Sequence, residues 1–147
     1  MGVGLLDVNA LLALLMENND FHPQMARWFT TNQHAGWATC PITELGFVRV
    51  ISNAAFVKPA PKIGLAIDLL RRSTQSSSHH RFWPEGFRLS DLAPSVKSQL
   101  TGHKQITDAY LLSIAIRNGG RLVTFDRRIR QLAPQGSEEQ DSLEILT

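Results

Sequence analysis

Short apolar runs alternate with longer segments of helical periodicity along most of the chain. The first run, Val3 to Leu6, has the length of a strand, and apolar residues then recur at helical spacing from Val8 to Leu15. The pattern predicts later strands at residues 36–40, 81–91 (irregular), 121–125 and 143–146. Because strands that alternate with helices are typical of βαβ units, we expect an α/β fold with helices on both faces of a mostly parallel sheet of four to five strands.

Proline, glycine and polar runs bound the other predicted helices. Proline suits the first turn of several of them, and glycine suits the end of one. These helices are expected at residues 22–31, 41–53, 59–72, 94–100, 106–118 and 126–132. In the helix at residues 59–72, the spacing of Ile63, Ile67 and Leu70 predicts that these three side chains share one face.

The composition fits one globular domain over residues 1–147, since 43% of the residues are hydrophobic. The net charge of +2 permits an anionic partner without requiring one. Cys40 is the single cysteine, which excludes an internal disulfide, and its apolar surroundings predict a buried side chain. The N-terminal apolar run has no basic segment before it and is interrupted by polar residues. We therefore expect neither a signal peptide nor a membrane span, and a cytoplasmic protein.

Four acidic residues lie where strands lead into helices. Asp7 and Asp126 directly follow the apolar runs of "GLLD" and "LVTFD". Glu44 lies in the first turn of the helix after "WATC", and Asp108 lies in the first turn of the helix that precedes residues 121–125. Each acid alone has a structural explanation, because carboxylates at helix N-termini act as caps and gain about 0.3 to 1 kcal/mol from the helix dipole.

Together, the four acids indicate a shared ligand site. In an open parallel sheet, the helix N-termini that follow the strands lie along the edge where ligands bind, so these carboxylates are expected to converge. Converging carboxylates repel one another, and a bound cation relieves the repulsion. A ligand set of oxygens without histidine or cysteine favours a hard divalent ion, Mg²⁺ with Mn²⁺ as the alternative. A metal held in this way activates water and neutralises charge on a phosphate, which favours phosphodiester hydrolysis.

Four motifs, each with one of these acids, resemble the acidic blocks of the PIN domain. The blocks are "LLDVNALLALL", "TELGFVRV", "ITDAYLLSIA" and "LVTFDRRI", and the resemblance extends from Gly4 to about Leu132. It implies a three-layer α/β/α PIN-like domain. Within the family, the chain is most similar to the VapC-type toxins of type II toxin-antitoxin pairs. The segment from about Ala54 to Gln105 carries little of the resemblance.

The resemblance also implies roles for individual residues. The acids that resemble the catalytic and metal-binding residues of the family are Asp7, Glu44, Asp108 and Asp126. Asp7 and Asp108 resemble direct Mg²⁺ ligands, whereas Asp126 resembles an acid that binds metal directly or through water. Asn9 and Thr124 resemble polar residues that support the pocket.

The activity implied by the resemblance is that of a Mg²⁺-dependent endoribonuclease, which cuts single-stranded or loop RNA and leaves a 5′-phosphate and a 3′-hydroxyl. The implied partners are a VapB-like antitoxin, whose C-terminal segment covers the acidic groove, and a second copy of the chain. Arg127, Arg128 and Lys104 lie near two of the acids in the sequence and are candidate RNA contacts. A solvated helix face explains these three cations equally well.

Two other interpretations stay open at this point. A PIN-like module that binds RNA or a protein without cutting it would share the fold, although the complete acid set argues against this alternative. A metal-dependent phosphatase on a doubly wound sheet is the second, but the chain has no clear phosphate-cradling loop. Among the tryptophans, the contexts of Trp28 and Trp37 favour core packing, and Trp83 stays open to base stacking.

Overall fold

A computed structural model describes residues 2–84 and 86–147, and within these ranges five parallel strands form the central sheet. The strand order is β3-β2-β1-β4-β5, and every neighbouring pair is parallel. The strands are β1 (Gly4–Leu6), β2 (Trp37–Thr39), β3 (His80–Phe82), β4 (Arg121–Thr124) and β5 (Leu143–Ile145). The predicted irregular strand is therefore a short regular one at the edge of the sheet, and the predicted parallel α/β sheet is confirmed.

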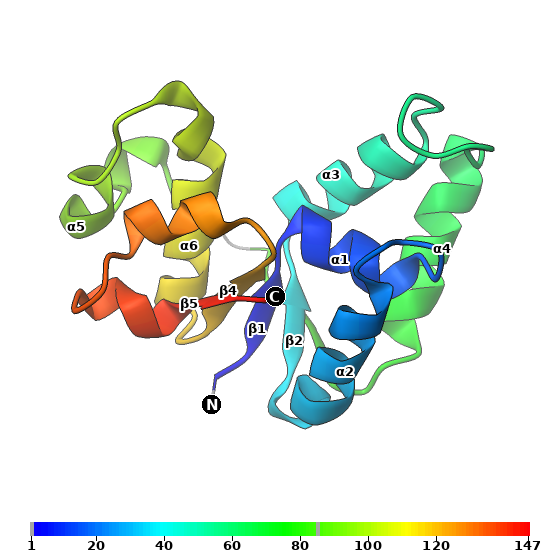
Figure 1. The fold of residues 1–147 in the computed structure, drawn as a ribbon, viewed down its shortest axis with the longest axis horizontal. Helices are drawn as coiled ribbons and strands as arrows, with labels where there is room; N and C mark the ends of the chain where they lie inside the picture. The colour runs from blue at the N-terminus through cyan, green and yellow to red at the C-terminus, as the bar shows by residue number, and fades with distance from the viewer. Residues whose placement is uncertain (1, 85) are drawn as a thin grey trace.

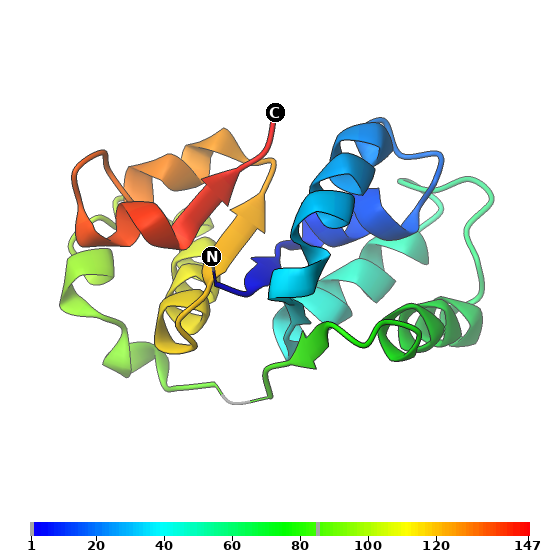
Figure 2. The same ribbon diagram turned by 90° about the horizontal axis from the view of Figure 1, so that it is seen from below.

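Helices cover both faces of this sheet (Figures 1 and 2). One face carries α1 (Val8–Leu15), α2 (His22–Asn32), α3 (Pro41–Ile51) and α4 (Ile63–Gln75). The other face carries α5 (Pro94–Lys97), α6 (Ile106–Arg117) and the 3-10 helices η4 (Arg127–Leu132) and η5 (Glu138–Ser142). The arrangement is the expected three-layer α/β/α sandwich.

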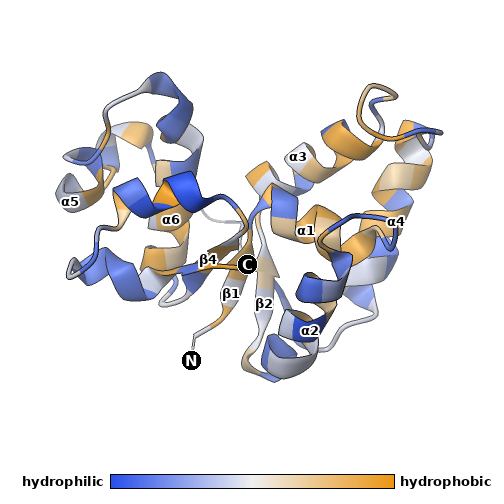
Figure 3. Ribbon diagram, viewed as in Figure 1, coloured by the Kyte–Doolittle hydropathy of each residue, from blue (hydrophilic) through white to orange (hydrophobic). Residues whose placement is uncertain are grey.

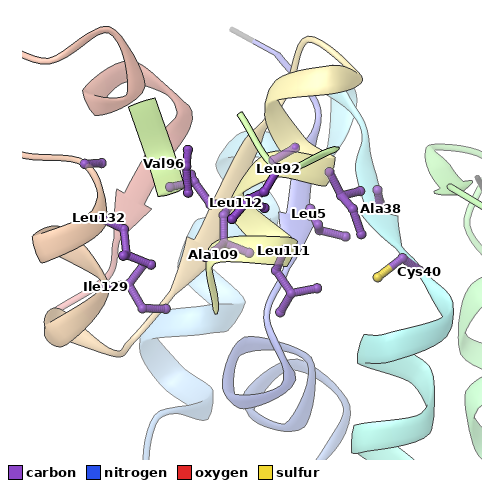
Figure 4. Close-up of a cluster of buried hydrophobic side chains, with 14 residues drawn as sticks. Leu5, Ala38, Cys40, Leu92, Val96, Ala109, Leu111, Leu112, Ile129 and Leu132 are labelled. Carbon is purple, nitrogen blue, oxygen red and sulfur yellow. The ribbon is translucent and has the colours of Figure 1, made fainter. Parts of the chain in front are cut away.

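The alternation of side chains along the strands divides the core between the two faces. Leu5 packs in the cluster beneath α6, and its neighbour Leu6 packs in the cluster beneath α1 to α4. This is the period of two that a strand buried on both sides requires. Figure 4 shows Leu5 and Ala38 from the sheet beside Leu111 and Leu112 from α6. Cys40 is fully buried, as its sequence context predicts.

The order in which strands are added to the sheet reverses at β1. The chain moves outward from β1 through β2 to β3, and then crosses back to β4 on the other side of β1. The carboxyl ends of β1 and β4 consequently lie side by side, with Leu6 paired to Val123. Ligands bind in open α/β sheets at this kind of switch point, where the connections on its two sides leave a crevice.

Helix α4 begins later than predicted, and the apolar face predicted for it is only partly buried. The helix begins at Ile63 rather than Pro59, because a proline disfavours helical geometry in the residue before it and two prolines occupy this stretch. Ala66 and Leu70 are buried, whereas Ile63 is 63% and Ile67 50% exposed. Figure 1 shows α4 at the outer side of the molecule next to α3, so only a narrow stripe of the helix is covered.

The segment after β4 also differs from the prediction, since η4 is a 3-10 helix rather than an α-helix. Its two buried residues, Ile129 and Leu132, are three positions apart, which is the spacing that a 3-10 helix brings to one side. The remainder of the segment is strongly hydrophilic (Figure 3). Within the described residues, no helix combines the length and the apolar composition that crossing a membrane requires.

Candidate active site

Asp7 lies at the carboxyl end of β1 and caps the N-terminus of α1. Its Oδ1 accepts a hydrogen bond from the Val8 amide at 2.8 Å, and its Oδ2 accepts one from the Thr124 hydroxyl at 2.8 Å. The residue is only 7% exposed. Burial raises the pKa of Asp7, and the Asp126 charge adds to this effect, although the two hydrogen bonds oppose it. The carboxyl is therefore both a helix cap and a costly buried charge.

Thr124 joins the ends of β1 and β4. Its fully buried hydroxyl donates to Asp7 and accepts from the Asp126 amide at 3.0 Å and from Asn9 Nδ2 at 3.1 Å. Asn9 also accepts a hydrogen bond from the Phe125 amide at 3.0 Å through its Oδ1. The predicted pocket residues Asn9 and Thr124 thus form one network, which fixes the start of α1 against the end of β4.

Asp108 and Asp126 complete an electrostatically coupled group with Asp7. Asp108 lies in the first turn of α6. Burial raises its pKa to about 6, and the charges of Asp7 and Asp126 contribute to the rise. Asp126, in contrast, accepts hydrogen bonds from the Arg128 side chain, which lower the pKa of Asp126. Three of the four predicted acids therefore act on one another at the switch point.

Glu44 takes part in a different contact at the end of β2. Its Oε2 accepts a hydrogen bond from the Thr39 hydroxyl at 2.6 Å. Because this uses the single hydroxyl proton, the 2.9 Å contact between Thr39 Oγ1 and His80 Nε2 has the imidazole as donor. Glu44 and His80 also line a hollow of about 330 Å³ beside α4.

Sequence reasoning missed Thr39 and His80. Thr39 lies in a strand that reads as apolar, and His80 ends a polar serine-rich run that reads as a loop. The available signal was that Thr39 is the last residue of β2, as Thr124 is of β4. Burial lowers the pKa of His80, which favours the neutral imidazole at pH 7.

The three candidate RNA contacts are exposed, and they lie on 3-10 helices that adjoin Asp126 or precede Asp108 in the sequence. Arg127 and Arg128 are exposed on η4, and Lys104 is exposed on the 3-10 helix η3 (His103–Gln105) directly before α6. Arg128 is bound to Asp126 through its guanidinium. Trp28 and Trp37 are buried, as predicted, and Trp83 packs partly buried against the α6 cluster, which leaves little of its ring for stacking on a base.

The donor set fits a hard divalent cation. It consists of carboxylate oxygens from Asp7, Asp108 and Asp126, and such ions coordinate oxygen ligands and retain waters. The raised pKa values of Asp7 and Asp108 are those expected where a compensating positive charge belongs. Within residues 2–84 and 86–147, no three acidic, histidine or cysteine side chains are preassembled closely enough to hold a metal by themselves.

Asp108→Asn is expected to stabilise the metal-free protein at neutral pH but not at acid pH. Because the folded-state pKa is raised to about 6, the carboxyl contributes stability below its unfolded-state pKa and loses it as the pH rises through about 6. The amide has no such loss. Because Asp108 is only partly buried, solvent screening leaves a gain on the order of 1 kcal/mol near neutral pH. Urea unfolding in chelator at acid and neutral pH measures this gain in stability. A difference between variant and wild type that does not change with pH would contradict the raised pKa of Asp108.

The chain belongs to the PIN domain family, since its residues 4–134 match the family model of the PIN domain. This match confirms the family resemblance of the four acidic motifs, and it includes every candidate site residue described above.

Three relatives from Mycobacterium tuberculosis (strain ATCC 25618 / H37Rv) narrow the class. Ribonuclease VapC44 is 43% identical over 136 residues, which cover 92% of this chain and 94% of the relative. Ribonuclease VapC38 is 41% identical over 145 residues, or 99% of each chain. Ribonuclease VapC39 is 40% identical over 135 residues, covering 92% and 96%. Within the PIN domain family, the chain is thus of the VapC type.

Proposed function

We propose that this chain is a Mg²⁺-dependent endoribonuclease and the toxin of a type II toxin-antitoxin pair. The observation that carries the proposal is the group of coupled carboxylates at the switch point, in which Asp7 and Asp108 have raised pKa values. Its relatives named as ribonucleases supply the chemical class. Residues 1–147 are proposed to act as one PIN domain.

The site residues are proposed to have two kinds of role in hydrolysis, namely binding the metal and orienting the residues that bind it. Asp7 and Asp108 are proposed to hold Mg²⁺, or Mn²⁺ in its place, and Asp126 to act on the ion directly or through water. When bound, the ion supplies a more acidic water and neutralises charge on the scissile phosphate. Thr124 and Asn9 orient Asp7 and the start of η4 through their hydrogen bonds.

Glu44 is proposed to act as the fourth catalytic acid from the neighbouring end of β2. Its bond to Thr39 leaves the other carboxylate oxygen, Oε1, available to accept a proton or a water. Through this oxygen, Glu44 is proposed to bind the metal or a water beside it.

The proposed partners follow from the same class. Arg127, Arg128 and Lys104 are exposed cations that are suited to contact RNA phosphates. A VapB-like antitoxin is proposed to cover the acid site, and the chain is proposed to form a homodimer and a heteromeric complex with the antitoxin. A cytoplasmic location is proposed on the basis of the VapC class, which implies an RNA substrate.

Removal of divalent metal is the direct test of this function. The purified protein is expected to cut RNA in Mg²⁺, to stop in a chelator, and to resume cutting when Mg²⁺ is restored. Asp108→Asn is expected to lose about 100-fold or more of the cleavage rate, because the variant would no longer hold the cation that neutralises charge in the transition state. Asp20→Asn, which changes an exposed acid in a polar run, serves as the matched control.

Two results would overturn the proposal. Undiminished cleavage by folded Asp108→Asn protein would show that the acid site does not carry the reaction. RNA binding without any turnover in either Mg²⁺ or Mn²⁺ would favour a non-catalytic PIN-like binding module.

A further inference from the structure

Arg128 occupies both carboxylate oxygens of Asp126. Its Nε donates to Oδ1 at 3.0 Å, and one terminal guanidinium nitrogen donates to Oδ2 at 2.8 Å. The Arg128 backbone amide also donates to Oδ1, at 2.9 Å. An acid proposed to face the metal is therefore bound by the chain's own cation in this structure.

The backbone contact alone explains how Asp126 caps η4. A cap of this kind needs only the backbone amide of a following residue, and any residue except proline at position 128 would supply it. The guanidinium contact is additional, and it buries little, because the Arg128 side chain is 80% exposed. A structural role in capping or packing does not account for it.

The position of the guanidinium indicates an electrostatic role. Arg128 lowers the pKa of Asp126 through hydrogen bonds and charge, and its charge also acts on Asp108. It thus supplies positive charge to two of the carboxylates that a divalent ion would neutralise. An exposed ion pair contributes only about 0 to 1 kcal/mol, so a divalent cation competes with it readily.

We propose that Arg128 is an exchangeable counter-ion of the acid site, which binds Asp126 in the metal-free protein and is released when a divalent cation binds. The released guanidinium is then free to bind a phosphate of the RNA. A phosphate group suits the same bidentate contact as a carboxylate. Occupation of the metal site and capture of the substrate are in this way linked through one side chain. The inference rests on the proposed function, since it requires a metal at the acid site.

The test measures Mn²⁺ affinity in the absence of RNA, by electron paramagnetic resonance of the free ion. Arg128→Ala is expected to bind Mn²⁺ about threefold to fivefold more tightly than the wild type, the range for loss of one exposed competing charge pair. Arg130→Ala removes an exposed arginine of the same segment and is expected to change the affinity by less than about twofold. In an Asp126→Asn background, the effect of Arg128→Ala should shrink to the smaller part that acts through Asp108.

Thermal unfolding gives a second readout that does not depend on activity. In chelator, Arg128→Ala should lower the Tm, because the carboxylates lose their counter-ion, and in saturating Mg²⁺ this difference should vanish. An equal loss of Tm in both conditions would overturn the proposal and indicate a merely structural contact. Unchanged Mn²⁺ affinity in Arg128→Ala would also overturn it while leaving the proposed function intact. Failure of the wild type to bind Mn²⁺ at all would instead refute the metal-dependent function, and this inference with it.

Discussion

Asp7→Asn is expected to reduce RNA cleavage by about 100-fold or more while the protein stays folded. The substitution removes the negative charge proposed to hold the metal. It retains an oxygen that accepts from Val8 or Thr124, and asparagine caps helices about as well as aspartate. Cleavage assays in Mg²⁺, together with circular dichroism of the same samples, separate loss of chemistry from loss of fold.

The same variant is expected to be more stable than the wild type in chelator at neutral pH. Because burial raises the folded-state pKa of Asp7, its carboxyl contributes stability at acid pH and loses it as the pH rises through that raised pKa. The gain from Asn should therefore shrink as the pH falls toward the ordinary pKa of aspartate. An Asp7→Asn protein that unfolds, yet retains its activity per folded molecule, would show that Asp7 is a helix cap alone.

Thr124→Val is expected to weaken metal binding by about 10- to 100-fold, as is typical when a group that orients a metal ligand is removed. Valine keeps the shape of the side chain but removes the hydroxyl that donates to Asp7 and accepts from the Asp126 amide. These two buried groups would lose their partner, which costs about 1 to 3 kcal/mol. Calorimetric titration with Mg²⁺ and urea unfolding measure the two effects.

Thr124→Ser is the matched control, because it keeps the hydroxyl and removes only the methyl group. Its metal affinity should stay within about threefold of the wild type if the hydrogen bonds carry the effect. Equal losses of affinity in the valine and serine variants would assign the role of Thr124 to packing rather than to orientation of the acids.

The parallel sheet and three of the acids could be predicted because local patterns determine them. Short apolar runs before polar junctions fix where β1 and β4 end, and the parallel arrangement brings Asp7 and Asp126 to one edge. The first-turn position of Asp108 adds the third carboxylate. These features depend on side-chain period and strand direction, both of which are visible in the sequence.

The contacts that refine the site were not predictable in the same way. The hydrogen bonds among Glu44, Thr39 and His80 depend on β3 lying beside β2, and the Thr39–His80 contact joins residues 41 positions apart in the sequence. The exposed face of α4 depends on how far α3 covers it, which periodicity does not report. The ion pair of Arg128 depends on a rotamer choice between solvent and Asp126.

The pairing of β1 with β4 also determines when the acid site can form while the polypeptide is being synthesised. The bond between Thr124 and Asp7 spans 117 positions, and β4 pairs directly with β1. Contacts of such long sequence separation form late, because a large loop must close before they are gained. A nascent chain that ends before β4 holds Asp7 without Asp126 or the Thr124 hydroxyl. The proposed cutting activity would therefore appear only after most of the polypeptide has been made.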